Sequence, residues 1–215
     1  MEAKAQIPRI IVFGRTGVGK SSLGNEIFSL KEVFKVGNTM FSETREIQQE
    51  TRPWPLDNSK QVTFIDTPGF ADNRADVKNS EILDKIMALL ESLKGGFNIG
   101  LFCWAAQARF DANDINELDV LGLLLGHPAF AHMWIVVTKI NTFVPDEQKK
   151  KKESVPKELP KLLEDNLIPA MNTHIYFPDF TNRESFENDF LAPLSELINE
   201  CPSYIPEAAL QIDEQ

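Results

Sequence analysis

The sequence predicts an α/β domain of three layers, in which helices cover both faces of a mostly parallel sheet with one antiparallel strand pair. Segments with the composition of strands alternate with segments of helical apolar spacing along most of the 215 residues, which is the pattern of a parallel sheet. A short link at 56–59 joins two of the strands, which must therefore be antiparallel neighbours. We assign residues 9–200 to this domain, 1–8 to an N-terminal lead-in and 201–215 to a C-terminal tail.

Six segments have the composition of strands: 9–13, 44–54, 61–66, 97–105, 133–138 and 173–177. The first, fourth and fifth contain continuous apolar runs, as expected for strands that are buried on both faces. The second mixes polar residues with β-formers and is expected to be an exposed strand. The turn-forming residues 56–59 connect it to the third segment and complete the antiparallel pair.

Five segments are predicted to be helical: 21–29, 79–93, 111–125, 146–166 and 184–199. Asp111 begins the third of them, with Asp114 in its first turn, where an acidic side chain stabilises a helix. The fourth holds six lysines and six acidic residues and is expected to be exposed. Pro156 and Pro160 should break or restart it, because proline lacks the backbone N–H that a helix interior needs.

Composition limits the class of protein. A formal net charge of −10 argues against a non-specific nucleic-acid or anionic-membrane surface. No apolar run approaches the roughly 18 residues needed to span a bilayer, and the N-terminus lacks a signal-peptide apolar region. Cys103 and Cys201 make no disulfide framework, and Cys103 is expected to be buried. We expect a cytoplasmic protein that binds no nucleic acid and does not itself span a membrane, and interpret Lys149–Lys152 as a solvated helix face.

The stretch Gly14–Ser21 fits the phosphate-binding pattern G-x-x-x-x-G-K-[ST] at every position. It follows a predicted buried strand and opens a predicted helix, so backbone N–H groups and the helix N-terminus would point at one anion. This context disfavours the alternative of a glycine-rich turn that matches by chance. Lys20 would reach the outer phosphates, and the Ser21 hydroxyl would help to hold Mg²⁺. We expect the nucleotide phosphates to be bound by Arg15, Thr16, Gly17, Val18, Gly19, Lys20, Ser21 and Ser22.

Asp66-Thr67-Pro68-Gly69 ends a predicted strand, at the edge of the sheet where ligands bind in such folds. In a P-loop NTPase, a carboxylate here holds Mg²⁺, and the following glycine offers its N–H to the terminal phosphate. Together with the antiparallel pair, this motif predicts a P-loop NTPase of the GTPase type, a G domain. The long loop after the first helix should add a hydroxyl over Mg²⁺. The candidates are Thr39, Ser42 and Thr44.

Thr138-Lys139-Ile140-Asn141 follows a predicted strand at the point where a GTPase carries its base-recognition motif, N/T-K-x-D. The lysine stem of that motif packs on the base, and its aspartate accepts hydrogen bonds from guanine. Asn141 replaces the aspartate, and an amide offers one acceptor and an unwanted donor. A mismatched buried donor costs about 1–3 kcal/mol. We expect the site to bind guanine, with the preference for guanine over other bases either weakened or restored by another residue.

These motifs resemble those of the immunity-associated (AIG/GIMAP-type) GTPases, relatives of septins and of the chloroplast import GTPases, over about residues 9–199. The matching stretches are 14–25, 41–44 and 66–70. A box peculiar to the family, G-R-F-T-x-x-D, is similar to residues 108–114, where Ala108 and Asp111 depart from it. Phe180-Thr181-Asn182-Arg183 resembles the fifth motif of the family, whose asparagine lies beside the base. The resemblance implies GTP or GDP with Mg²⁺, Thr44 as the magnesium hydroxyl, and Thr181 and Asn182 in the base site.

Hydrolysis needs a positioned water and positive charge on the transition state. Phe70 follows Gly69 where a Ras-like protein offers a water-orienting glutamine, so we expect slow hydrolysis that depends on Lys20, Thr44, Gly69 and Arg109. Arg109 could reach a neighbour's phosphates across a face-to-face dimer, or it could simply pair with a surface acid. Arg15 is a second candidate for the missing charge.

Two classes of function remain open. The first is a GTPase switch that dimerises or oligomerises through its nucleotide face. The second is a nucleotide-stabilised scaffold with negligible turnover or altered base specificity. A small-molecule kinase is disfavoured, because such kinases lack the Asp66–Gly69 motif and usually carry an arginine-rich lid.

Overall fold

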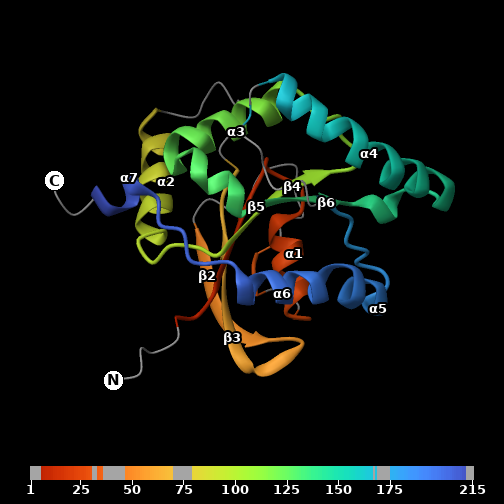
Figure 1. Ribbon diagram of the computed structural model, residues 1–215, viewed down its shortest axis with the longest axis horizontal. Helices are drawn as coiled ribbons and strands as arrows, with labels where there is room; N and C mark the ends of the chain where they lie inside the picture. The colour runs from red at the N-terminus through yellow and green to blue at the C-terminus, as the bar shows by residue number, and fades with distance from the viewer. Residues whose placement is uncertain are drawn as a thin grey trace.

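The computed structural model describes residues 6–30, 33–35, 47–69, 79–166, 168 and 175–211 (Figure 1). Its sheet has six strands in the order β2-β3-β1-β4-β5-β6. The strands are β1 Arg9–Phe13, β2 Gln48–Trp54, β3 Asp57–Asp66, β4 Ile99–Ala105, β5 Met133–Thr138 and β6 Ile175–Tyr176. The pair β2–β3 is antiparallel and every other neighbouring pair of these described strands is parallel. The predicted fold class is therefore confirmed.

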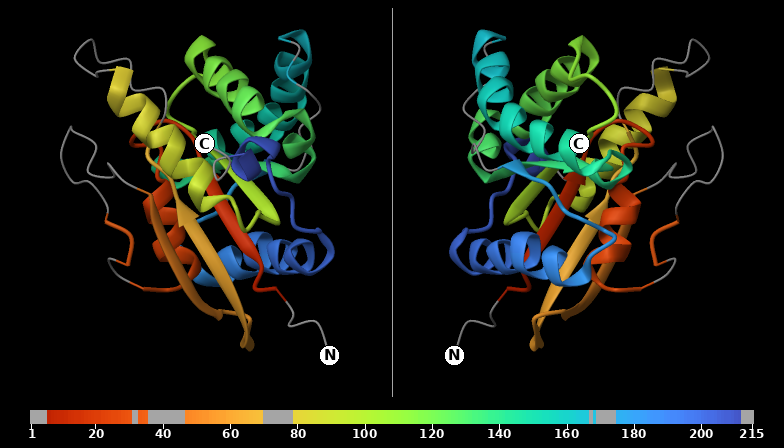
Figure 2. Two further views of the ribbon diagram at one scale, coloured as in Figure 1. Left: turned by 90° about the vertical axis from the view of Figure 1, so that its left-hand side faces the viewer. Right: turned by 90° about the vertical axis from the view of Figure 1, so that its right-hand side faces the viewer.

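Helices cover both faces of this sheet. They are α1 Lys20–Ile27, α2 Asn79–Ser92, α3 Ala112–Leu125, α4 Pro145–Asp165, α5 Arg183–Phe186, α6 Ala192–Glu200 and α7 Glu207–Leu210. Figure 2 shows the sheet between α2, α3 and α4 on one side and α1 and α6 on the other. Successive strand residues face opposite sides, so β1 contributes Ile11 and Phe13 to the first core and Ile10 and Val12 to the second.

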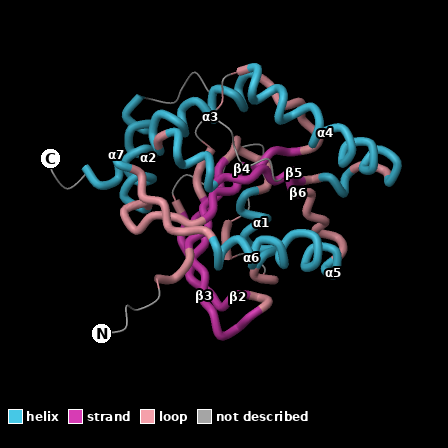
Figure 3. Tube along the Cα trace, in the orientation of Figure 1, coloured by secondary structure: helices cyan, strands magenta, loops and turns pink. Residues whose placement is uncertain are grey.

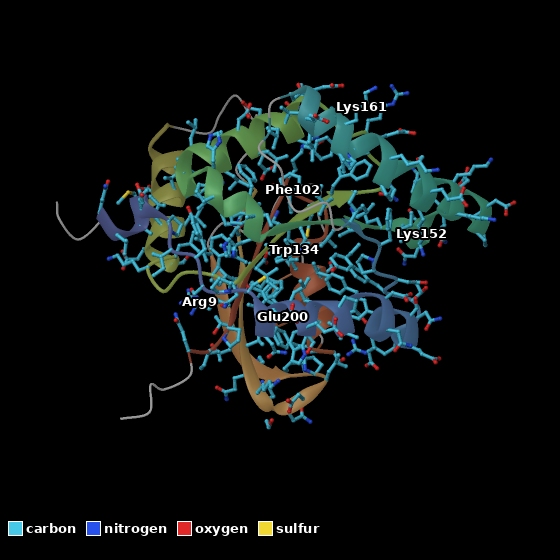
Figure 4. The ribbon with its side chains drawn as sticks, viewed as in Figure 1. Arg9, Phe102, Trp134, Lys152, Lys161 and Glu200 are labelled. Carbon is cyan, nitrogen blue, oxygen red and sulfur yellow. The ribbon has the colours of Figure 1, made fainter. Side chains whose placement is uncertain are left out.

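The two cores are built largely from aromatic and β-branched side chains. Phe102 and Trp134, labelled in Figure 4, lie on neighbouring central strands and are fully buried. Phe102 faces the core under α2, α3 and α4, whereas Trp134 faces the core under α1 and α6. Burial of one such side chain contributes about 1.5–3 kcal/mol. The central strands are thereby fixed, and with them the loops at their carboxyl ends. No described helix is long and apolar enough to cross a membrane.

The β2–β3 hairpin is tighter than predicted. Trp54 pairs with Asp57, so the turn consists of Pro55 and Leu56, and β3 begins four residues before its predicted start. Pro55 cannot donate to a strand ladder, which places the turn on it and not on residues 56–59. Figure 3 shows the hairpin extending beyond the helices. The predicted strand over 44–54 is found at 48–54, and its first residues lie outside the described part.

The helix α4 corrects the prediction of a break at Pro156 and Pro160, because it runs through both prolines without interruption. The two rings are four residues apart, on the same side of the helix, and Pro156 is exposed. The carbonyls that lose their helical donors can therefore be hydrated, which reduces the cost of each proline. Lys152 and Lys161, labelled in Figure 4, are exposed along this helix.

The predicted helix over 184–199 is found as three consecutive segments, α5, a π-helical turn at Glu187–Leu191 and α6. Pro193 offers a physical reason, because it has no N–H for the carbonyl of Asp189. A wider turn directly before it changes the hydrogen-bond register and lets the helix continue.

The described part of the predicted tail, residues 201–211, packs against the domain. Tyr204 exchanges two backbone hydrogen bonds with Phe97, at 2.9 and 2.8 Å. Its hydroxyl donates to the carbonyl of Leu125 at the end of α3, at 2.6 Å. Ala209 of α7 is fully buried in the core shared with α2 and α3. Phe97, predicted as the first residue of a strand, is thus paired with this segment, and β4 begins at Ile99.

Candidate nucleotide-binding site

The phosphate loop lies between β1 and α1, as the sequence predicts. Gly14 has a φ of 128°, and a Cβ there would lie 2.3 Å from the carbonyl oxygen of Cys103 on β4. Glycine is required at this point because no other residue fits both restrictions. Lys20 is buried, and its Nζ donates to the carbonyls of Gly14 at 2.6 Å and Arg15 at 3.0 Å. The Lys20 ammonium group is therefore bound by backbone carbonyls of the phosphate loop itself.

Ser21 and Asp66 meet beside this loop, although 45 residues separate them in the chain. The Ser21 hydroxyl donates to Oδ2 of Asp66 at 2.6 Å. Asp66 is fully buried, and its Oδ1 has no hydrogen-bond partner in the described part of the chain. Burial raises the pKa of Asp66, against the opposing effects of the Ser21 hydrogen bond and the Lys20 charge. A buried hydroxyl and carboxylate with an unsatisfied oxygen suit a hydrated Mg²⁺ ion.

The segment Asp66–Gly69 continues from β3 directly onto the phosphate loop. Thr67 donates its hydroxyl hydrogen to the carbonyl of Val12 on β1, at 2.6 Å. A Cβ on Gly69 would lie 2.5 Å from the backbone nitrogen of Thr16. Gly69 therefore lies against the backbone of the phosphate loop at Thr16. Phe70 lies outside the described residues.

The base-recognition segment is attached to the phosphate loop from the carboxyl end of β5. Thr138 is fully buried, and its hydroxyl donates to the carbonyl of Val18 in the loop and to that of Trp104, the latter at 3.2 Å. Lys139 has a φ of 57°, and its Nζ donates to the carbonyl of Gly17 at 2.7 Å. The Lys139 side chain thus reaches from the end of β5 to the phosphate loop. Asn141 lies in the short 3₁₀ helix Ile140–Thr142, where it is half-buried.

The fifth motif follows β6, the neighbour of β5. Asp179 Oδ1 accepts hydrogen bonds from the Thr181 backbone N–H at 2.9 Å and from the Thr181 hydroxyl at 2.6 Å. Asn182 caps α5 by accepting from the Ser185 N–H at 3.1 Å. The side chains of Thr181 and Asn182, both assigned to the base site by the resemblance, are therefore occupied with local structure here.

Arg109 and Arg15, the two candidates for the missing positive charge, differ in their contacts. Arg109 is exposed between β4 and α3, and no ion pair with it occurs among the described residues. Arg15 instead lies 3.4 Å from Asp111 and 3.9 Å from Asp114, measured from Nη1 to a carboxylate oxygen. Asp111 and Asp114 also form the capping box that begins α3. Arg15 therefore links the phosphate loop to α3, which argues against it as the missing catalytic charge.

Most of the predicted site residues gather at one edge of the sheet. These are the loop residues 15–22, Asp66, Gly69, Thr138, Lys139 and Asn141. Thr39, Ser42 and Thr44 lie outside the described residues. Sequence reasoning missed the contribution of Thr67, Asp114 and Asp179. The acidic residue at the fourth position of the α3 capping box and the Asp-x-Thr turn after β6 are the signals that could have indicated the last two.

Comparisons with known proteins agree with this geometry. The immune-associated nucleotide-binding proteins 3 and 7 from Arabidopsis thaliana are 26% and 29% identical over 132 and 138 residues, which are 61% and 62% of this chain. The chain spans only 38% and 41% of those relatives. A crystal structure of a dimerisation-deficient mutant of Toc33, also from Arabidopsis thaliana, superposes with a TM-score of 0.67 at 17% identity, covering 94% of this chain and 88% of Toc33. The model of the AIG1 family matches residues 8–202, and the chain therefore belongs to the AIG1 family.

Proposed function

We propose that this chain is the guanine-nucleotide-binding domain of a Mg²⁺-dependent GTPase that hydrolyses GTP slowly and acts as a nucleotide-dependent switch. The observation that carries the proposal is the contact between Ser21 and Asp66 beside the buried Lys20. Lys20 and Ser21 come from the phosphate loop and Asp66 from the motif at the end of β3, and together they provide the groups that a Mg²⁺-bound triphosphate requires.

Mg²⁺ would be held by the Ser21 hydroxyl and, through water, by Asp66, with Thr44 as a further proposed ligand. The bound ion supplies charge that neutralises the phosphate oxygens. The unpartnered Oδ1 of Asp66 and the short Ser21 hydrogen bond suit this role. Lys20 is already within reach of the loop carbonyls, and its ammonium can turn to the outer phosphates without leaving the loop.

Guanine is the base that we propose. The Lys139 side chain extends from the end of β5 to the phosphate loop, as the lysine of a guanine-recognition motif should. Membership of the AIG1 family also supports guanine as the base. A structure of Toc33, whose fold is similar to that of this chain, contains GDP and Mg²⁺. The two thiols, Cys103 and Cys201, are free and support the proposal of a cytoplasmic location.

Slow hydrolysis follows from the lack of a water-orienting glutamine after Gly69. Arg109 is exposed on the segment that leads into α3 and forms no ion pair with another described residue, and we propose that it reaches the phosphates of a second copy. Dimerisation is described as important for the GTPase activity of the translocon components Toc33 and Toc159. An arginine supplied across an interface raises the rate of phosphoryl transfer by about 10³–10⁵.

Steady-state GTP turnover, measured from nanomolar to high micromolar protein, tests the proposal. The specific activity of the wild type should rise with protein concentration. At the highest concentration, the specific activity of Arg109→Ala should be lower than that of the wild type by a factor of about ten or more. Arg52→Ala is the matched control, because Arg52 is a partly exposed arginine on β2. Flat, near-zero turnover by the wild type would favour the nucleotide-stabilised scaffold. Equal rates for wild type and Arg109→Ala at every concentration would remove Arg109 from the mechanism.

A further inference from the structure

The base site presents a chemical problem that Asn141 cannot solve alone. Guanine offers two donors, the N1–H and the N2 amino group, and one acceptor, O6. A carboxylate accepts from both donors, whereas the amide of Asn141 has one accepting oxygen and a donating NH₂ group. We propose, on the basis of the proposed guanine-binding function, that Asp179 supplies the carboxylate that recognises the N1–H and N2 amino groups of guanine.

The sheet brings Asp179 to the correct edge. β5 and β6 are parallel, and Ile135 pairs with Ile175 and Val136 with Tyr176. Lys139 directly follows β5, and Asp179 lies three residues after the end of β6. Both strands end at the carboxyl edge, where ligands bind in open α/β sheets. Asp179 therefore lies in the loop that adjoins the Thr138–Asn141 segment.

The Asp179 carboxylate is oriented and ionised. Oδ1 accepts the two Thr181 hydrogen bonds at 2.9 and 2.6 Å, which fix the orientation of the carboxylate. Burial disfavours the charged form, but the Thr181 hydrogen bonds and the charge of Lys152 outweigh it and hold the pKa of Asp179 below its ordinary value. A half-buried carboxylate with a fixed orientation is prepared to accept from a ligand.

The two side chains then divide the recognition of the base. Asp179 takes the donors of guanine, and the NH₂ group of Asn141, which makes no hydrogen bond within the described part of the chain, can donate to O6. The same division rejects adenine, which carries a donor in place of O6 and no donor at N1. The substitution at position 141 is thereby compensated from the neighbouring loop.

A purely structural role for Asp179, as the residue that fixes the turn before α5, makes a different prediction. If Asp179 had only this role, its substitution would destabilise the fold and would lower the affinity for all nucleotides by the same factor. Recognition of the base instead changes the ranking of diphosphates that differ only at position 2 of the purine. Inosine diphosphate lacks the amino group there, and xanthosine diphosphate carries a carbonyl.

The experiment is a calorimetric titration of GDP, inosine diphosphate and xanthosine diphosphate into wild type, Asp179→Asn and Asp179→Ser. Wild type should bind GDP at least about tenfold more tightly than the other two, since tenfold corresponds to about 1.4 kcal/mol. Asp179→Asn should lose this preference for GDP and should bind xanthosine diphosphate more tightly than the wild type does. Asp179→Ser keeps an acceptor for the turn but has no second oxygen, so it should lose the preference while remaining folded. Adding Asn141→Asp to either variant should restore it.

Asp189→Asn is the matched control, because Asp189 is an exposed acid that accepts a 2.6 Å hydrogen bond from Ser185 in the adjacent helical turn. It should leave the ranking unchanged. If Asp179→Asn and Asp179→Ser keep the wild-type preference for GDP, the assignment of Asp179 is wrong and the proposed function stands. If wild type binds ADP as tightly as GDP, both the guanine proposal and this assignment fail.

Discussion

The phosphate end and the base end of the candidate site are built from different kinds of contact. At the phosphate end, Lys20, Ser21 and Asp66 are almost completely buried and hydrogen-bonded within the protein. At the proposed base end, Asn141 and Asp179 are half-buried residues of two segments that follow neighbouring strands. The groups at the phosphate end come from the loop before α1 and from the end of β3, whereas those at the base end come from the loops after β5 and β6.

Lys20, Ser21 and Asp66 keep the common pattern of the phosphate-binding motifs, whereas Asn141 replaces the aspartate of the base-recognition motif. A phosphate is recognised by backbone N–H groups that glycine geometry must place, so substitutions at Gly14 or Gly69 meet backbone atoms at once. A base is recognised by side-chain donors and acceptors, which a neighbouring loop can supply equally well. Gly14 and Gly69 therefore cannot be replaced without moving backbone atoms, whereas a side-chain donor or acceptor for the base is not tied to one position.

The largest expected effect comes from breaking the phosphate end with Lys20→Ala. GTP, GDP and ATP should all bind about 100-fold more weakly, or about 2.7 kcal/mol, because charge-assisted hydrogen bonds to phosphate are lost. The ratio of GTP to ATP affinity should stay constant, since the base loops are untouched. Isothermal titration of the three nucleotides measures this, with Lys149→Ala on the exposed face of α4 as control. A change in the ratio would show that the two ends are not separate.

A smaller effect is expected from Gly69→Ala, which addresses the terminal phosphate alone. The added Cβ would lie 2.5 Å from the Thr16 nitrogen and must displace the segment. GTP affinity should fall about tenfold, within the usual 1–3 kcal/mol cost of overpacking, and GDP affinity should hardly change. Gly95→Ala is the control, because its Cβ would lie 2.4 Å from the Arg9 guanidinium at the opposite edge of the sheet. Equal losses for GTP and GDP would contradict the sensor role.

The smallest effect is expected from Asp111→Asn, at the ion pair between the phosphate loop and α3. The Arg15 and Asp111 side chains are 34% and 45% exposed, so water screens the pair and its contribution to stability should stay below about 1 kcal/mol. A double-mutant cycle with Arg15→Gln, followed by urea unfolding, measures the coupling. A coupling energy above about 2 kcal/mol would mean that this link is part of the folded core.

Much of the fold could be predicted because its elements are strongly patterned. The apolar runs of β1, β4 and β5, the glycine loop and the Asp111 cap are each read from neighbouring residues. The uninterrupted α4 could not be predicted, since local rules place a break at Pro156 and the exposed position of that proline, which reduces its cost, is known only from the structure. The docking of Tyr204 depends on contacts with Phe97 and Leu125, which are distant in sequence.

The candidate site, like the fold, could be predicted from the sequence only in part. The lysine, serine and glycines of the phosphate loop and the aspartate at the end of β3 follow from two motifs, and the structure brings them together. The pairing of Arg15 with Asp111 could not be inferred, because both arginines and several acids were compatible with such a pair. Asp179 could not be singled out from the sequence, because its proposed role depends on the pairing of β5 with β6.

The most direct test of the central claim is a competition between GTP and ATP for the wild-type protein. A fluorescent guanine nucleotide is bound in the presence of Mg²⁺, and the concentration of each triphosphate needed to displace half of it is measured. We predict that GTP displaces it at a concentration about 100-fold lower than ATP, which corresponds to about 2.7 kcal/mol of base discrimination despite Asn141. Equal displacement by the two triphosphates, or preference for ATP, would contradict the account of a site whose base end still selects guanine.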